Sequence, residues 1–250
     1  MNPSTLVGLS VVMYKGKSAI GLITARGGSK GLPGKNLRPL CGRPLVGWTT
    51  LRARESRLLD CVVLSTDSPE IAAVGRAEGV EVPFMRPAEL ATDTAASLSV
   101  VDHALEFYSR ERGQQFDYIV LLEPTCPLRR EDDIDGMLAQ LIDHADFFDS
   151  IISIGKVVQL HPAGVKRRDG YRLVPFMPEL PQNLRRQDYE PAYYPFGAIY
   201  IVSTPAYQRE RTFYTARCTY FELERYQCYD IDDLYDFMCV EAVMKHVWGM

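Results

Sequence analysis

The stretch Ser18-Ala-Ile-Gly-Leu-Ile-Thr-Ala-Arg-Gly-Gly-Ser-Lys-Gly-Leu-Pro-Gly-Lys-Asn36 decides the fold of this chain. Its first part, residues 18–24, is a compact apolar run, which is typical of a buried strand, and it leads directly into a loop rich in glycine. Glycine lets backbone N–H groups turn inward and approach an anion closely. Arg26 can hold phosphate oxygens in a fork, and Lys35 adds a point charge. The loop therefore suits a triphosphate, with a purely structural glycine turn as the alternative.

Three familiar motifs can be compared with this loop. Gly27-x-Ser29-x-Gly31 matches the nucleophile elbow of hydrolases, but Pro33 and Gly34 interrupt the helix that should follow. A Walker A loop needs Ser or Thr after its Gly-Lys pair, and here Asn36 follows. The dinucleotide pattern G-x-G-x-x-G is absent. We therefore expect a phosphate loop of another kind.

Beyond the loop, apolar runs and helical periodicities alternate along the chain. We expect further strands at residues 61–65, 81–84, 117–122, 151–158 and 197–202, and helices at 44–57, 69–77, 94–108, 132–142 and 232–247. This alternation predicts an α/β fold with a mostly parallel sheet, whose ligands bind beyond the carboxyl ends of the strands. Residues 161–195 lack a helical period, and packing against a second subunit would explain such a long irregular segment.

Composition narrows the classes of function. The chain has 250 residues and a net charge of −4, yet residues 1–54 contain no acidic side chain and carry nine Lys and Arg. A mildly acidic protein with one basic segment favours a single anion site over general nucleic-acid binding, although a solvated basic loop would look similar. No apolar run approaches the roughly 18 residues of a membrane span, and no C-x-x-C pair occurs. We expect a cytoplasmic protein with free thiols and with no membrane or nucleic-acid partner.

Several sequence blocks, taken in order, resemble one known family. They are Ala25–Leu40, Val63-Leu-Ser-Thr-Asp67, Met85–Ser97, Leu121-Leu-Glu-Pro-Thr-Cys-Pro-Leu-Arg129, Arg186-Gln187, Gly197-Ala-Ile-Tyr200 and Asp230-Ile-Asp232. Together they are similar to the acylneuraminate cytidylyltransferases, which make CMP-sialic acid and related CMP-activated acidic sugars. The resemblance extends over about residues 18–245.

This resemblance implies a reaction and an architecture. The anomeric hydroxyl of a keto acid sugar would attack the α-phosphate of CTP, and pyrophosphate would leave. The fold would be a single Rossmann-like nucleotidyltransferase domain over residues 18–250, with 1–17 as an N-terminal extension. Mg²⁺ would be the cofactor. The protein would be a homodimer in which an extension near 155–195 reaches the partner's active site.

The same resemblance assigns individual residues. Those implied to be catalytic are Arg26, Lys35 and Asp232. Those implied to bind the nucleotide are Ala25, Arg26, Gly27, Asn36, Arg86, Ala95 and Ser97. Those implied to bind the acceptor are Glu123, Arg186, Gln187, Phe196 and Tyr200, and the implied metal ligands are Asp230 and Asp232.

Three of these assignments have structural alternatives, of which that for Arg186 is a basic surface rim with Arg185. Asp230 and Asp232 are two residues apart, so both carboxylates point to one side of an extended chain, which suits Mg²⁺. An acidic pair at a helix start more often caps the helix, although Asp233 and Asp236 are available for that task. Arg86 could instead form a surface salt bridge with Glu89.

The chain departs from the family pattern at two acceptor positions. The family's glutamine in L-L-Q-P-T is Glu123 here, and the asparagine of its Pro-Asn-Gly is Phe196. An ionised glutamate can only accept hydrogen bonds, whereas glutamine also donates them. Both changes leave the CTP half of the site intact but put N-acetylneuraminate in doubt as the acceptor. Legionaminate-like, deaminated or eight-carbon keto acids and phosphonates remain open, as does a catalytically silent nucleotide-binding paralogue.

Overall fold

A six-stranded sheet forms the centre of the protein, in the order β10-β6-β9-β5-β1-β4. The computed structural model describes residues 13–92, 97–182 and 184–250. The strands of the sheet are β1 (Ala19–Thr24), β4 (Cys61–Ser65), β5 (Tyr118–Leu122), β6 (Ser150–Lys156), β9 (Tyr193–Ser203) and β10 (Cys218–Glu222). Only β9 runs antiparallel to its neighbours in this sheet, so the predicted mostly parallel α/β fold is confirmed.

Strand β1 lies between β4 and β5, in register with both. Leu22 is opposite Val63 on one side and Leu121 on the other. These strands are almost continuously apolar because helices cover both faces of the sheet. The quoted stretch therefore supplies an interior strand that is paired on both sides, and its loop leaves the sheet at the carboxyl edge.

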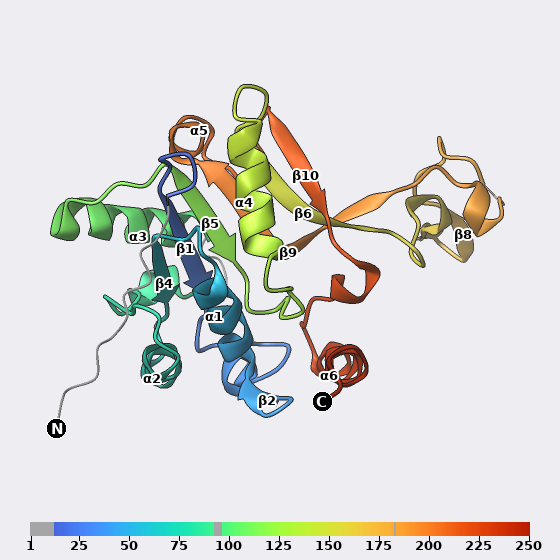
Figure 1. The fold of residues 1–250 in the computed structure, drawn as a ribbon. Coiled ribbons are helices and arrows are strands. Elements are labelled where there is room, and N and C mark those ends of the chain that lie inside the picture. The colour runs from blue at the N-terminus through green and yellow to red at the C-terminus, as the bar shows by residue number, and fades with distance from the viewer. Residues whose placement is uncertain (1–12, 93–96, 183) are drawn as a thin grey trace.

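Helices pack in layers on the two faces of the sheet (Figure 1). The helices are α1 (Leu45–Glu55), α2 (Pro69–Ala77), α3 (Ser97–Arg112), α4 (Asp133–Asp143), α5 (Thr204–Glu210) and α6 (Leu234–Trp248). Apolar side chains of α1, α2 and α4 share one core cluster, and those of α3 and α5 share a second. A third cluster joins α6 to the start of α1. Within the described ranges, no helix is long and apolar enough to span a bilayer.

Two helix starts illustrate how local sequence sets these elements. Helix α2 begins at Pro69, as predicted, because the Ser68 hydroxyl accepts a hydrogen bond from the backbone N–H of Ile71. Helix α6 begins at Leu234, two residues later than predicted, because Asp233 caps it together with Asp236 in a capping box. Asp233, and not Asp230 or Asp232, therefore caps this helix.

Some elements differ from the sequence expectations. Residues 81–84 do not form a strand, since Glu81 makes only an isolated bridge to Val63. Helix α5 and strand β10 have no counterpart among the predicted elements. Helix α3 is described from Ser97 onward, and the predicted start at Thr94 lies outside the described residues.

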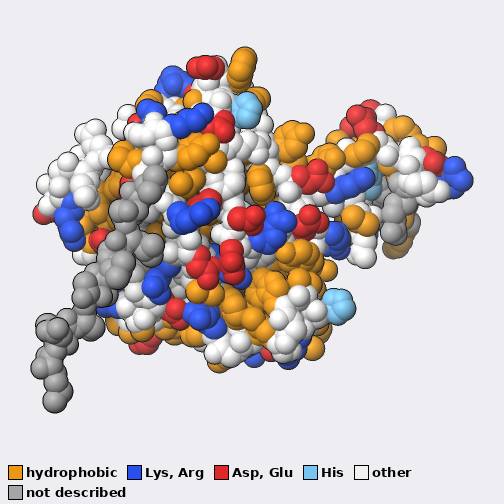
Figure 2. All heavy atoms as spheres, viewed as in Figure 1, with side chains coloured by type: hydrophobic (Ala, Val, Ile, Leu, Met, Phe, Trp, Pro, Cys, Tyr) orange, Lys and Arg blue, Asp and Glu red, His pale blue; other side chains and the backbone are white. Residues whose placement is uncertain are grey.

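A narrow arm projects from the sheet between β6 and β9 (Figures 1 and 2). It contains the hairpin of β7 (Lys166–Asp169) and β8 (Arg172–Pro175) and the short 3-10 turns η3 (Pro162–Gly164) and η4 (Arg186–Asp188). The arm contains no α-helix among its described residues, as expected from the missing helical period of residues 161–195. Several large apolar side chains of the arm are exposed: Leu160, Val165, Tyr171, Leu173, Phe176 and Leu184.

The remaining short elements lie around the body. They are η1 (Lys35–Leu37), β2 (Pro39–Leu40), β3 (Arg43–Pro44), η2 (Ala88–Leu90) and η5 (Arg225–Gln227). Of these, η1 matters most, since it continues the glycine-rich loop and presents two of the predicted site residues.

Candidate active site

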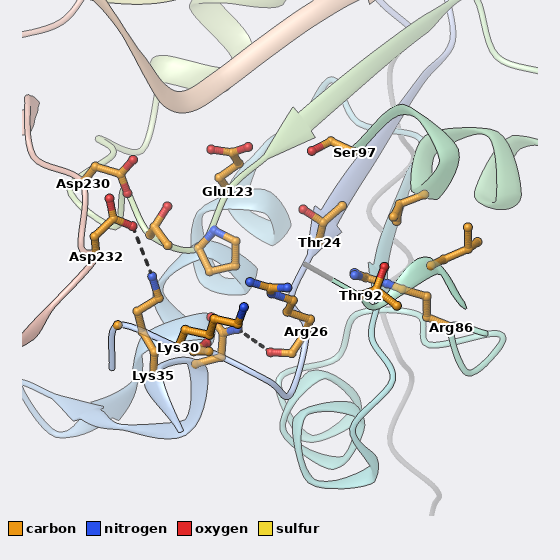
Figure 3. Close-up of a pocket in the computed structure, with 17 residues that line it drawn as sticks. Thr24, Arg26, Lys30, Lys35, Arg86, Thr92, Ser97, Glu123, Asp230 and Asp232 are labelled. Atoms are coloured by element: carbon orange, nitrogen blue, oxygen red, sulfur yellow. Dashed lines mark hydrogen bonds and ion pairs between the residues drawn. The ribbon is translucent and has the colours of Figure 1, made fainter. Parts of the chain in front are cut away.

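A cavity of about 580 Å³ opens at the carboxyl edge of β1 and β5. Its lining residues are Thr24, Arg26, Ser29, Lys30, Gly31, Lys35, Asn36, Arg86, Leu90, Thr92, Ser97, Val100, Glu123, Pro124, Thr125, Asp230 and Asp232. Figure 3 shows Asp230, Asp232 and Glu123 on one side, Arg86, Thr92 and Ser97 on the other, and Arg26 and Lys30 between them. The position beyond the strand ends matches the place where α/β sheets bind ligands.

The glycine-rich loop supplies three of the cations of this cavity, Arg26, Lys30 and Lys35. Arg26 follows β1, and its backbone carbonyl accepts a 3.0 Å hydrogen bond from the Asn36 side-chain amide. Lys35 is buried, donates from Nζ to the carbonyl of Ile231 at 2.6 Å, and lies 3.6 Å from a carboxylate oxygen of Asp232. Ser29, Lys30 and Gly31 line the cavity too, although no role was assigned to them from sequence.

Two predicted nucleotide-binding residues of the loop do not line the cavity. Ala25 is buried, and its N–H donates to the carbonyl of Ser65. The Gly27 N–H donates to the carboxylate of Asp67 at 2.9 Å. Both backbone groups are therefore used to fix the loop against β4 and the turn that follows it.

The end opposite the carboxylates is formed around Arg86. Its Nε donates to the Ser65 hydroxyl at 3.1 Å and its Nη2 to the Ser65 carbonyl at 2.5 Å. Burial lowers the pKa of the Arg86 guanidinium to about 10. Arg86 is thus a buried wall residue and forms no surface salt bridge with Glu89 among the described contacts. Ser97 and Val100 complete this end from α3, whereas Ala95 lies outside the described residues.

The two predicted metal ligands lie together at the other end. The Asp230 and Asp232 side chains project to the same side (Figure 3). The intervening Ile231 is fully buried. The Asp232 side chain is 84% exposed to the cavity and solvent, and its backbone N–H donates to Asp236 at 2.9 Å. In the described part of the chain, no group of three or more His, Cys, Asp or Glu is arranged to hold a metal ion. Two carboxylates still fit Mg²⁺, which takes one or two of them together with substrate phosphate oxygens.

Glu123 follows β5 and enters the floor of the cavity. Burial raises the pKa of its carboxyl group to about 7, and the nearby carboxylates of Asp230 and Asp232 add to the shift, while Arg129 and Lys35 oppose it. A Cβ atom at Gly197 would overlap the Glu123 carboxylate. The bare Cα of Gly197 therefore makes the room in which this side chain sits.

A buried arginine supports this floor and was not singled out from sequence. Arg129 is 1% exposed and donates to the carbonyls of Glu123 and Ala198, both at 2.6 Å, and to the Thr49 hydroxyl at 2.9 Å. Burial lowers the pKa of its guanidinium to about 10. Arg129 ties β5, β9 and α1 together directly behind the cavity.

The raised pKa of Glu123 gives a pH-dependent stability. The native carboxyl group binds its proton more tightly than the same group in the unfolded chain, whose ordinary pKa is 4.5. The stabilisation from this proton is therefore complete below pH 4.5 and is lost as the pH rises through about 7. The unfolding free energy of Glu123→Gln should therefore exceed that of the native protein by ~3 kcal/mol more at pH 8 than at pH 4.5. Thermal melts of metal-free, nucleotide-free protein across this range measure it. Parallel curves for the two proteins would contradict the assignment.

Three other predicted acceptor residues, Gln187, Phe196 and Tyr200, do not line the cavity. Tyr200 is opposite Leu121 in the sheet, and its ring contacts Tyr214 at 6.1 Å between centroids. Phe196 packs against Tyr194, 5.4 Å between ring centroids. Gln187 is on the arm, in η4, and the Arg186 side chain lies outside what the structure describes. Of the predicted acceptor residues whose side chains the structure describes, only Glu123 lines the cavity.

Comparison with known proteins places this geometry in context. Residues 20–232 match the model of a cytidylyltransferase family. The chain is 35% identical over 223 residues to an N-acylneuraminate cytidylyltransferase of Streptococcus agalactiae, covering 88% of this chain and 51% of that protein. It is 34% identical over 230 residues to a CMP-N,N'-diacetyllegionaminic acid synthase of Legionella pneumophila, covering 90% of this chain and 96% of that protein. The chain thus spans about half the length of the streptococcal relative.

A solved structure has the same fold. It is a CMP:2-keto-3-deoxy-manno-octonic acid synthetase complexed with CTP, with a TM-score of 0.68 and 18% sequence identity. The match covers 92% of this chain and 99% of that one. At this level of identity the similarity concerns the fold alone.

Proposed function

The chain belongs to the cytidylyltransferase family, and on that premise we propose that it transfers CMP from CTP to an acidic keto sugar of the nonulosonate kind. One observation carries the proposal. A single cavity brings together a glycine-rich cationic loop, a buried arginine wall and a pair of carboxylates, which come from distant parts of the sequence. Transfer at phosphorus needs mainly positioning and stabilisation of charge, and this set of groups supplies both.

The nucleotide would lie across the cavity from Arg86 to Lys35. The base fits the end lined by Arg86, Ser97 and Val100, where buried polar groups and an apolar wall meet. The triphosphate fits the central loop, where Arg26 and Lys30 would neutralise its oxygens. Asn36 holds the carbonyl of Arg26 and so keeps the loop in shape.

The carboxylate pair is the natural place for the cofactor. Asp230 and Asp232 would hold Mg²⁺ with phosphate oxygens completing its ligands, and the bound ion would neutralise charge on the reacting phosphates. An anomeric hydroxyl of the acceptor then forms the new bond to the α-phosphorus. The bond from that phosphorus to the β-phosphate oxygen breaks, pyrophosphate leaves, and the hydroxyl proton passes to solvent. Lys35 would stabilise the charge that develops on pyrophosphate.

A pyrophosphate-release assay tests the proposal. The purified protein is incubated with CTP and Mg²⁺ and a panel of keto acid sugars and phosphonates. Release should require CTP, Mg²⁺ and an acceptor together. A silent nucleotide-binding protein would bind CTP without release on any acceptor, and a serine hydrolase would be inactivated by serine-directed reagents.

Glu123 should influence which acceptor is used. Above pH 7 Glu123 is ionised, and a carboxylate of the sugar at ~4 Å would then cost about 1 kcal/mol in water and several times more in a partly dry pocket. We expect N-acetylneuraminate to be a poor acceptor and Glu123→Gln to improve its kcat/KM relative to the best acceptor, since discrimination resides in that ratio. Both acceptors should be measured with both proteins. Good native use of N-acetylneuraminate with an unchanged ratio in the variant would remove Glu123 from this role.

We also propose a homodimer in which the arm contacts the partner chain. The arm exposes large apolar side chains, including Leu160, Tyr171 and Leu173, which a second subunit would cover. Light scattering at micromolar concentration should give about twice the mass of the chain. A fully active monomer would contradict this prediction.

The six free thiols fit a reducing compartment, and we propose that the protein resides in the cytoplasm.

A further inference from the structure

The phosphate loop rests directly on the segment that carries the two carboxylates. Lys35 Nζ donates to the Ile231 carbonyl at 2.6 Å, and Leu32 of the loop lies in the same apolar cluster as Ile231. On its other side, the Ile231 N–H donates to the Thr125 carbonyl at 2.9 Å. The carboxylate segment is therefore held between the loop and the residues that follow β5.

Gly31 faces the backbone of Asp232 with no room for a side chain between them. A Cβ atom at this position would overlap the carbonyl oxygen of Asp232 and lie 3.3 Å from its carbonyl carbon. The backbone of Gly31 is not left-handed, so glycine is needed here for space and not for conformation. Gly28 in the same loop differs, because a Cβ there would meet nothing within 4 Å.

Asp232 has little freedom to yield to a larger residue. Its N–H is bound to the Asp236 carboxylate at 2.9 Å, and the preceding Ile231 is fully buried. A side chain at position 31 must therefore push either the loop or the Asp232 backbone away. Each movement would also disturb Lys35, which binds the carbonyl of Ile231 and lies 3.6 Å from the Asp232 carboxylate.

We propose that Gly31 is a positioning residue: its bare Cα sets the Asp232 carboxylate relative to the phosphate loop, so that triphosphate and divalent metal bind in a coupled way. This inference rests on the proposed function, in which the loop holds the triphosphate and Asp232 holds the metal. Coupling between two sites is reciprocal, so nucleotide on the loop favours the metal geometry and metal favours the nucleotide. Gly31 acts through Asp232 and need not touch the reacting atoms.

Mn²⁺ serves as the probe for the Mg²⁺ site, because both ions take oxygen ligands. Its affinity is measured by electron paramagnetic resonance for CTP alone and for protein with stoichiometric CTP and no acceptor. Native protein and Gly28→Ala should tighten Mn²⁺ binding over CTP alone, within twofold of each other. With Gly31→Ala and CTP, Mn²⁺ should bind about tenfold more weakly than with the native protein and CTP, because a disturbance around a bound metal usually costs affinity of this order. Its CTP affinity in EDTA should change less than threefold. Equal tightening in both alanine variants would overturn the proposal.

A double substitution distinguishes the role of Gly31 from the metal role of Asp232. Asp232→Asn should lose the tightening, and adding Gly31→Ala to it should cause no further loss, because both changes act on one group. If Asp232→Asn keeps the full tightening, the metal assignment of the proposed function fails. If it loses the tightening while Gly31→Ala does not, only the role of Gly31 fails.

A measurement on the native chain covers the case in which Gly31→Ala does not fold. Hydrogen exchange is followed at the Ile231 and Asp232 amides, whose acceptors are Thr125 and Asp236. Metal-free CTP in EDTA should slow exchange at both amides by severalfold. No change at either amide would overturn the coupling.

Discussion

Replacing Asp232 with asparagine should lower turnover by roughly 100-fold or more and leave metal-free binding of CTP almost unchanged. The side chain keeps its shape, and the backbone contacts of Asp232 with Asp236 and Gly31 remain. What is lost is one of two carboxylates that would hold Mg²⁺, together with the charge facing Lys35. The measurement is kcat at saturating CTP and Mg²⁺, beside CTP affinity in EDTA.

The neighbouring residue offers a matched control. Asp233→Asn makes the same change of charge one position away, outside the cavity lining, and asparagine caps a helix as well as aspartate does. It should keep near-native turnover. Near-native turnover of Asp232→Asn at ordinary Mg²⁺ would rule out the metal role of Asp232.

Lys35→Ala should reduce turnover by about 100-fold, whereas the affinity of the protein for CMP should fall much less. CMP lacks the β- and γ-phosphates, so it makes no use of a charge placed for the departing pyrophosphate. Lys35 is buried and reaches the site from η1, where its Nζ is fixed by the Ile231 carbonyl. The comparison is kcat against the Kd for CMP, each relative to the native protein.

A second variant separates charge from packing at this position. Lys35→Met keeps most of the aliphatic stem in the buried site and removes only the ammonium group. It should lose as much turnover as Lys35→Ala with a smaller fall in Tm. A parallel loss of CMP affinity and turnover in both variants would show that Lys35 supports the fold or the base site instead of the pyrophosphate.

The sequence predicts the parts of the fold whose cause is local. Helix α2 has a serine cap and a first-turn proline, and its bounds match the expectation at both ends. Strand β10 was missed because Cys218–Glu222 is a half-exposed edge strand with no apolar run. Residues 81–84 have some strand character, but only Glu81 reaches a partner, so pairing and not propensity decides the outcome.

The residues of the candidate site likewise include some that local motifs predict and others that they do not. Arg26, Lys35, Asn36, Asp230 and Asp232 belong to compact motifs, and all of them line one cavity. Arg129 looks like an ordinary surface cation in sequence, since its three partners, Thr49, Glu123 and Ala198, lie on three separate elements. The raised pKa of Glu123 likewise depends on burial and on Asp230, over 100 residues away along the chain. Contacts between residues so far apart along the chain cannot be recognised from a single sequence.

The reversed strand β9 has a consequence for the order in which the protein folds. It joins the β4-β1-β5 half of the sheet to the β6-β10 half, which are not paired directly with each other. During synthesis, β5 and β6 have left the ribosome well before residues 193–203 follow, so the two halves must wait for the strand that closes them. Joining such distant segments is slow, because the loop must be closed before the contacts form. Until then the facing edges of β5 and β6 are open to other strands, and this nascent stage is where a chaperone has most to protect.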